Sequence, residues 1–501
     1  MNDLERLACG VIVAGFDGTT VSATLRDAFA QRQFAGYVLF GRNVENIEQV
    51  RALTGALRAL HDVPPLIAID QEGGRVMRIR EGVEEMPPMM ALGAIGDAIL
   101  AGRAGEQMGF DLRRCGCTLD FSPVLDLALD PRNTVIGTRS FGSDPQRVGL
   151  LGRRFAEGLE RAGIAATYKH FPGHGATFED SHLQLPRVTA DLATLRTRDM
   201  LPFALCAPDA SAIMTAHIVM DAIDGRNPAT LSRRVLTDVL RGELHFAGVC
   251  FTDCMQMDAV AKDPGTAQGI ASAIAAGADC ATVSHDPELA LAGARCIVRD
   301  VSRGVLSLER LQEAFARVTA LRRRGAPPPP LDAPSPHPGI GRAIARAAVT
   351  LLRGVAHADP TAAIAVSFEG VTVEGVVGRH EVHPSLQTEA PALAELRASL
   401  APDPAESASL LEGVAASGRR PIVLMRRAHM FPEQLGAVRA LIDRFPDALV
   451  VSVREPYDCA LVPQARHLVA AYGDDAASIG GLADILFGTA SANGMLPVVL
   501  S

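Results

Sequence analysis

The sequence lacks the features that mark several large classes of protein. Its formal net charge is −9, so no excess of basic residues provides a surface for nucleic acid or anionic lipid. No run of about eighteen uncharged apolar residues occurs, which argues against a membrane-spanning helix. Residues 1–6 lack the basic, apolar and small-residue order of a secretory signal. We therefore expect a cytoplasmic protein that binds neither nucleic acid nor membrane and acts on small molecules or neutral polymers.

The cysteines show no sign of a disulfide framework. The chain has nine of them, an odd number, and their spacing is not paired. Only Cys115-Gly116-Cys117 resembles a metal or redox motif, and two small residues at the start of a buried strand explain it better. The pattern predicts reduced thiols.

The first 324 residues alternate between two kinds of segment. Short apolar runs rich in β-branched residues are separated by longer stretches with helical spacing, which is typical of parallel βα units. Eight such runs predict an α/β fold with a (β/α)8 barrel. The runs cover residues 10–16, 36–42, 66–72, 117–126, 165–171, 211–218, 248–255 and 280–285.

Polar or charged residues lie at or just beyond the end of seven of these runs. In a (β/α)8 barrel these ends share one face, where the loops build the active site. A single polar strand end is usually a solvated loop start, so the coincidence carries the prediction. The residues are Asp17, Arg42, Asp70, Asp126, Lys169-His170, His217 and Asp253.

The composition changes after Arg324. Residues 325–340 are rich in proline and indicate a stiff connector. Beyond it, strand-like runs at 362–367, 421–425, 448–453 and 467–471 alternate again with helical stretches. We therefore predict a catalytic barrel over 1–324, a linker over 325–340 and a smaller α/β sandwich domain over 341–501.

Titratable groups are densest between Lys169 and His182. The stretch KHFPGHG (169–175) is followed by Asp180-Ser181-His182, a concentration of charge that is costly beside apolar chain unless it is used. An imidazole such as His182 can protonate a leaving group near neutral pH, and Asp180 can orient it. His174 receives no chemical role, and Phe171-Pro172 is predicted to be cis.

Asp253 is the candidate nucleophile. It ends the apolar run 248–251, where a partly desolvated carboxylate could attack an electrophilic carbon. A carboxylate nucleophile and one acid/base group are the minimal equipment of a retaining glycosidase, although a second carboxylate is more usual than a histidine. Asp70 could accept hydrogen bonds from vicinal hydroxyls, and Arg139 offers a rigid fork of five donors.

Metal binding is the alternative reading of the same cluster. His170, His174, Asp180 and His182 have the chemistry of zinc ligands. The ammonium group of Lys169 beside them disfavours a divalent cation. We therefore predict that the protein uses no metal and no other cofactor.

The motifs together resemble the bacterial β-N-acetylglucosaminidases of glycoside hydrolase family 3. KHFPGHG combined with DSH is the most specific part of the resemblance, which runs along the whole barrel and continues more loosely in LADILFGTASANGMLP near the C-terminus. The matching barrel motifs are DQEGGRV (70–76), FSPVLD (121–126), VIGTRSFG (135–142), KHFPGHG (169–175), DSH (180–182), MTAH (214–217), PATLS (228–232) and FTD (251–253).

The resemblance implies a role for each matched residue. It implies Asp253 as the nucleophile that forms a covalent glycosyl-enzyme, His182 as acid/base and Asp180 as the orienting partner of His182. A departure is Cys254, where the family has an acidic or apolar residue after the nucleophile. For the N-acetylglucosamine ring it implies binding by Asp70, Arg139, Lys169 and His170, supported by Arg75.

The implied activity is that of an exo-acting, retaining β-N-acetylglucosaminidase. Its expected partners are N-acetylglucosamine-containing saccharides, either cell-wall muropeptides or chitooligosaccharides. A neutral imidazole repels an anionic acceptor less than a carboxylate does, so a phosphorylase that uses phosphate is the first alternative. A catalytically silent sugar-binding protein is the second, and a metal-dependent hydrolase is the third.

Overall fold

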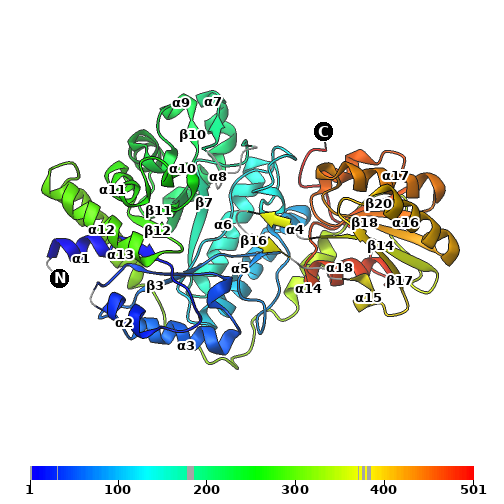
Figure 1. Cartoon of the computed structure of the whole chain (residues 1–501), viewed down its shortest axis with the longest axis horizontal. Coiled ribbons are helices and arrows are strands. Elements are labelled where there is room, and N and C mark those ends of the chain that lie inside the picture. Colours follow the sequence, from blue (N-terminus) through cyan, green and yellow to red (C-terminus); the bar gives the residue numbers. More distant parts are fainter. Residues whose placement is uncertain are drawn as a thin grey trace.

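The computed structural model describes residues 3–30, 32–177, 185–370, 372–374, 378–380 and 385–500. Its first part is a closed barrel of eight parallel strands surrounded by helices (Figure 1). The predicted (β/α)8 barrel is confirmed, and each strand lies within a predicted run. Around the barrel the strands are β1 (Ile12–Ala14), β12 (Cys280–Val283), β11 (Val249–Cys254), β9 (Ala212–Thr215), β7 (Ala165–Phe171), β6 (Leu119–Asp120), β3 (Leu66–Ile69) and β2 (Gly36–Leu39).

The helices outside the barrel begin at residues suited to that position. Asp144 caps α6 (Pro145–Arg161) by accepting a hydrogen bond from the Arg147 amide, and Asp286 caps α12 (Pro287–Ser302) in the same way. Each of these helices starts with proline, whose fixed φ suits the first turn. Other barrel helices are α3 (Ile47–Arg58), α4 (Met89–Ile95), α5 (Ala98–Arg114), α11 (Thr266–Ala276) and α13 (Leu308–Arg322).

The barrel interior is packed with apolar side chains. Val38, Leu119, Met214 and Phe251 belong to one buried cluster inside the strands. Phe251 also meets Phe121 edge to face, with ring centroids 5.6 Å apart. The barrel therefore has no central channel through this layer, and open space is confined to the ends of the strands.

A short hairpin follows β3. It consists of β4 (Gln71–Gly73) and β5 (Val76–Met77), which are antiparallel with Gln71 opposite Met77. Gly73 and Gly74 form the turn with φ of +99° and +56°, values that favour glycine. The hairpin folds the chain back over the end of the barrel beside β3.

The second part of the chain is an open sheet with its own helices. Five of its strands are parallel and the edge strand β13 is antiparallel. Residues 325–339 before it form neither helix nor strand, and the domain limits at 324 and 341 stay predictions. The strand order is β13 (Thr350–Arg353), β20 (His467–Ala470), β19 (Leu449–Ser452), β18 (Arg420–Met425), β14 (Ala363–Glu369) and β17 (Ala394–Ser399).

One helix joins the second sheet to the barrel. The helix α14 (Ile340–Ala348) packs against both α18 (Ala476–Leu486) of the second sheet and α4 of the barrel. In Figure 1 the second sheet accordingly lies beside the cyan part of the barrel. Among the residues described above, no helix combines the length and the apolar character needed to cross a membrane.

Candidate active site

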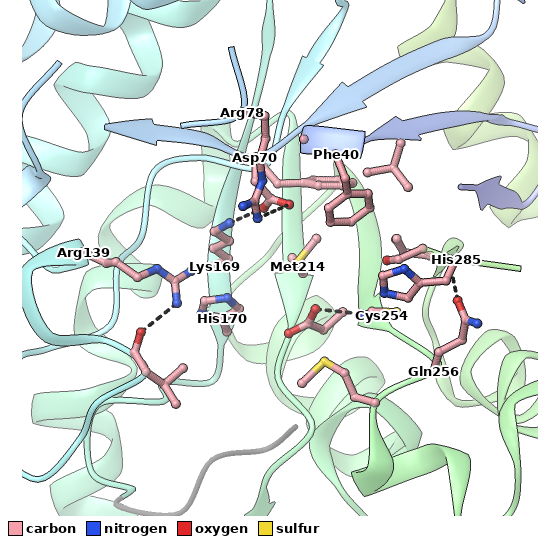
Figure 2. A pocket seen from close by; sticks show the side chains of 18 of the residues that line it. Phe40, Asp70, Arg78, Arg139, Lys169, His170, Met214, Cys254, Gln256 and His285 are labelled. Atoms are coloured by element: carbon pink, nitrogen blue, oxygen red, sulfur yellow. Dashed lines mark hydrogen bonds and ion pairs between the residues drawn. The ribbon is translucent and has the colours of Figure 1, made fainter. Parts of the chain in front are cut away.

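A pocket of about 480 Å³ opens where the barrel strands end. Phe40 and Arg42 follow β2, Asp70 follows β3 and His285 follows β12. Because all eight strands are parallel, their carboxyl ends bring these residues to one face. Figure 2 shows Arg139, Lys169 and His170 on one side of the pocket, with Phe40 and His285 on the other.

Lys169 is the centre of a buried network of charges. Its ammonium nitrogen lies 2.7 Å from Asp70 Oδ1 and 2.5 Å from Glu72 Oε1. Arg139 holds both oxygens of Glu72 with its fork, at 2.7 and 2.8 Å. Asp70 follows β3 and Lys169 lies in β7, two barrel strands separated by β6, whereas Glu72 reaches them from the hairpin.

The electrostatics of this network favour the charged forms of Glu72 and Lys169. Burial by itself would raise the pKa of Glu72, but the charges of Arg139 and Lys169 hold it well below its usual range. Burial likewise opposes the charge on Lys169, and Asp70 and Glu72 together raise its pKa above the ordinary value. The site therefore presents fixed donors and a carboxylate to a ligand with several hydroxyl groups.

His170 is held by a buried carboxylate behind it. Its Nδ1 lies 2.6 Å from Asp126 Oδ2, and Asp126 also accepts the backbone amide of His174 at 2.6 Å. Although burial would raise the pKa of Asp126, the charge of His170 and its hydrogen bond lower it. Nδ1 therefore carries the proton of this bond, and Nε2 is the ring nitrogen that remains for a ligand.

Asp253 lies in the wall of the same pocket, near the end of β11. Its Oδ1 accepts a hydrogen bond of 2.7 Å from the amide of Cys254. The carbonyl of Cys254 is in turn 2.9 Å from His217 Nε2, so a residue following β9 holds the backbone beside the carboxylate. Cys254 is half-buried, and loss of hydration raises the pKa of its thiol.

Two of the predicted catalytic residues, Asp180 and His182, lie outside the described residues. The described chain reaches Thr177, whose hydroxyl lies 2.8 Å from His174 Nδ1, and begins again at Leu185. His174 lines the pocket, and burial lowers its pKa to about 4. The roles of Asp180 and His182 stay predictions.

Arg75, which the resemblance implies as a support of the sugar ligands, does not itself line the pocket. It lies behind the pocket wall, 6% exposed, and donates to the carbonyl of Thr134 at 3.1 Å. Arg78 lines the pocket instead, with its guanidinium 3.9 Å from Asp70 Oδ2. The hairpin register explains this arrangement: Gln71 pairs with Met77, so the next residues outward, Asp70 and Arg78, lie near each other.

Residue types alone did not identify the buried residues that hold the predicted sugar ligands in place. Glu72 stands inside the DQEGGRV motif, but its contact with Lys169 joins residues far apart in sequence and is visible only in the fold. Asp126 carried a signal as a polar strand end, although its role as the support of His170 did not follow from that. Arg42 and His285 likewise reach the pocket from strand ends.

Two further expectations concern a peptide bond and the cysteines. The peptide Phe171-Pro172 is cis, as predicted, and Lys169-His170 is cis as well. All nine cysteines are free. Within the described part of the chain, no group of three histidine, cysteine, aspartate or glutamate side chains has an arrangement that could hold a metal ion.

Comparison with known proteins assigns this barrel and its pocket to a class of enzymes. Residues 7–321 match the glycosyl hydrolase family 3 N terminal domain. A beta-hexosaminidase of Pseudomonas aeruginosa (strain LESB58) is 40% identical over 287 residues, which are 56% of this chain and 86% of that protein. The barrel is therefore that of a glycoside hydrolase.

Solved structures extend the likeness to the whole chain. A glycoside hydrolase family 3 beta-N-acetylglucosaminidase from Paenibacillus sp. str. FPU-7 is 34% identical with a TM-score of 0.92, covering 100% of this chain and 99% of that one. NagZ from Neisseria gonorrhoeae, in complex with N-trifluoroacetyl-D-glucosamine, is 32% identical with a TM-score of 0.53 and covers 62% of this chain and 98% of its own. The chain belongs to glycoside hydrolase family 3, in its two-domain form.

Proposed function

We propose that the protein is an exo-acting β-N-acetylglucosaminidase that retains the configuration of the sugar. The observation that supports this most is the position of Asp253 in one pocket with Asp70, Lys169, Arg139 and His170. A carboxylate beside a set of buried hydroxyl ligands is suited to attack on the anomeric carbon of a bound sugar. The names of the relatives point to N-acetylglucosamine as that sugar.

The proposed reaction has two displacements. An Asp253 oxygen attacks the anomeric carbon, the glycosidic bond breaks, and His182 gives its proton to the leaving oxygen. His182, now neutral and oriented by Asp180, then takes a proton from water, whose oxygen attacks the glycosyl-aspartate and releases both sugar and carboxylate. The two inversions restore the original configuration.

The sugar ligands have distinct parts in this proposal. Lys169 and Arg139 donate to the ring hydroxyls, Asp70 accepts from a pair of them, and His170 offers Nε2. Arg78 joins this set in place of Arg75, because it lines the pocket. The natural substrates proposed are muropeptides or chitooligosaccharides that end in N-acetylglucosamine.

An aryl N-acetyl-β-glucosaminide tests the proposal. We expect the wild-type protein to release the aryl group, and Asp253→Ala to lose about a thousandfold or more of kcat. Proton NMR of the first sugar product should show the β-anomer. Release of the α-anomer, or unchanged turnover by Asp253→Ala, would contradict the mechanism. Product analysis with and without inorganic phosphate distinguishes hydrolysis from transfer to phosphate.

A further inference from the structure

The carboxyl edge of the second sheet is buried against the barrel. Arg427 follows β18, and Arg454 and Glu455 follow β19, so charged residues collect where the parallel strands of the sheet end. In open α/β sheets this edge is where ligands usually bind. Here Arg427, Arg454 and Glu455 are only 2–6% exposed. The edge is used for contact with the barrel instead.

That contact falls on one segment of the barrel, residues 128–143. The hydroxyl of Tyr457 donates to the carbonyl of Ala128 at 3.0 Å, and the amide of Ser143 donates to the carbonyl of Pro497 at 3.0 Å. Between them, Gly137 has φ of +46°, and a β-carbon built on it would lie 2.9 Å from Glu455 Oε1. The second sheet therefore meets the segment at both ends and in the middle.

The same segment carries Arg139 into the sugar pocket. The carbonyl of Val135 accepts a hydrogen bond of 2.9 Å from Arg139 and a longer one of 3.5 Å from Arg75. Arg75 also donates to Thr134, and its charge interacts with that of Glu455. Arg139 also donates a hydrogen bond to Glu72, which contacts Lys169. Polar contacts thus run from Arg75 through the Val135 carbonyl and Arg139 to the residues proposed to hold the sugar, and the charge of Glu455 acts on Arg75.

We propose that Glu455 and Tyr457 are positioning residues by which the second domain sets Arg139 for sugar binding. Within the described chain, no residue beyond 285 lines the pocket, so in this proposal the second domain acts on the substrate through the segment 128–143. This inference rests on the proposed function for its kinetic consequence. Its structural claim, that Glu455 and Tyr457 hold residues 128–143 in place, does not depend on which sugar is cleaved.

Two variants remove the contacts with little change of shape, and each has a matched control. Tyr457→Phe deletes the hydroxyl that reaches Ala128, and Tyr472→Phe deletes the hydroxyl of another buried tyrosine, which contacts Thr350 inside the second domain. Glu455→Gln removes the charge opposite Gly137. Its control is Glu395→Gln, whose carboxylate contacts Ser367 and Ser385 at a distant strand.

Hydrogen exchange measured by mass spectrometry tests the structural claim without any substrate. We expect amides of residues 128–139 to exchange at least about fivefold faster in Glu455→Gln and Tyr457→Phe, with no change in either control. Unchanged exchange in both test variants, or equal acceleration in the controls, overturns the proposal. A wild-type protein inactive on N-acetylglucosaminides would refute the proposed function, and this measurement would still decide the positioning role.

A double-mutant cycle tests whether the effect passes through Arg139. We expect Glu455→Gln to lower kcat/KM for the aryl N-acetylglucosaminide about tenfold, mostly through a higher KM, because a small misplacement of a ligand is costly. Arg139→Lys removes the guanidinium that bonds to the Val135 carbonyl. In that background the same substitution should change kcat/KM less than about twofold. Equal losses in both backgrounds would contradict action through Arg139.

Discussion

At the scale of single residues, the site depends on two carboxylates that lie behind the pocket lining, those of Glu72 and Asp126. Glu72 is almost fully buried and is the counter-ion of both Lys169 and Arg139. Two cations so close would repel each other in a medium that screens poorly, and both also lose hydration. The carboxylate offsets that cost and fixes the direction of each donor. Asp126 does the same for His170.

Glu72→Gln should therefore be severely destabilising. The substitution keeps the shape but leaves Lys169 and Arg139 without their shared counter-ion, which typically costs about 3–5 kcal/mol for a broken buried pair. We expect a lower unfolding midpoint in urea and a reduced kcat/KM. Glu433→Gln, on an exposed face of α17 (Pro432–Arg444), is the control and should change stability by no more than about 0.5 kcal/mol. An unchanged midpoint for Glu72→Gln would show that the network contributes little.

At the scale of secondary-structure elements, local pattern was sufficient for the barrel but not for the hairpin after β3. Each strand lies in a short apolar run and is mostly buried, so composition and spacing identify it without knowledge of its partners. The side chains that line the pocket from strand ends, such as Asp70 and Asp253, follow directly from that prediction. Arg78 and Arg75 stand in the same short stretch, and only the pairing register of the hairpin decides which one reaches the pocket.

Substitution of the two arginines separates these positions. Arg78→Met should raise KM for the aryl N-acetylglucosaminide about tenfold or more, with little change in melting temperature, because its guanidinium borders the pocket. Arg75→Met should lower the melting temperature by several degrees, since that side chain is buried and bonded to Thr134. If Arg75→Met left stability intact, or Arg78→Met left KM intact, the assignment drawn from the register would be wrong.

At the scale of the whole molecule, the contact between barrel and second sheet contains a carboxylate that burial keeps from ionising freely. Asp475 caps α18 by accepting from the Ser478 amide at 2.9 Å and is 4% exposed. Burial, assisted by the negative charges of Glu85 from the barrel and Asp474, raises its pKa from 3.8 to about 7, although hydrogen bonds from Ser478 oppose the shift. The proline-rich segment 325–340 predicted two parts of the chain, but no local pattern marks a charge interaction between residues as far apart in sequence as Glu85 and Asp475.

This raised pKa makes stability depend on pH in a direction that can be checked. Between about pH 4 and pH 7 the folded protein binds the Asp475 proton more tightly than the unfolded chain does, so its contribution is complete below pH 4 and is lost as the pH rises to about 7. The loss amounts to at most roughly 4 kcal/mol. His174, with its pKa lowered to about 4, acts in the opposite sense below pH 6.5, because the unfolded chain there binds the extra proton.

Asp475→Asn keeps an oxygen for the Ser478 amide and leaves His174 unchanged, so the difference between the two proteins isolates Asp475. We expect the unfolding free energy of the variant, relative to wild type, to increase from about pH 4 to about pH 8 in urea titrations at several pH values; a constant difference would mean that Asp475 ionises normally at the contact.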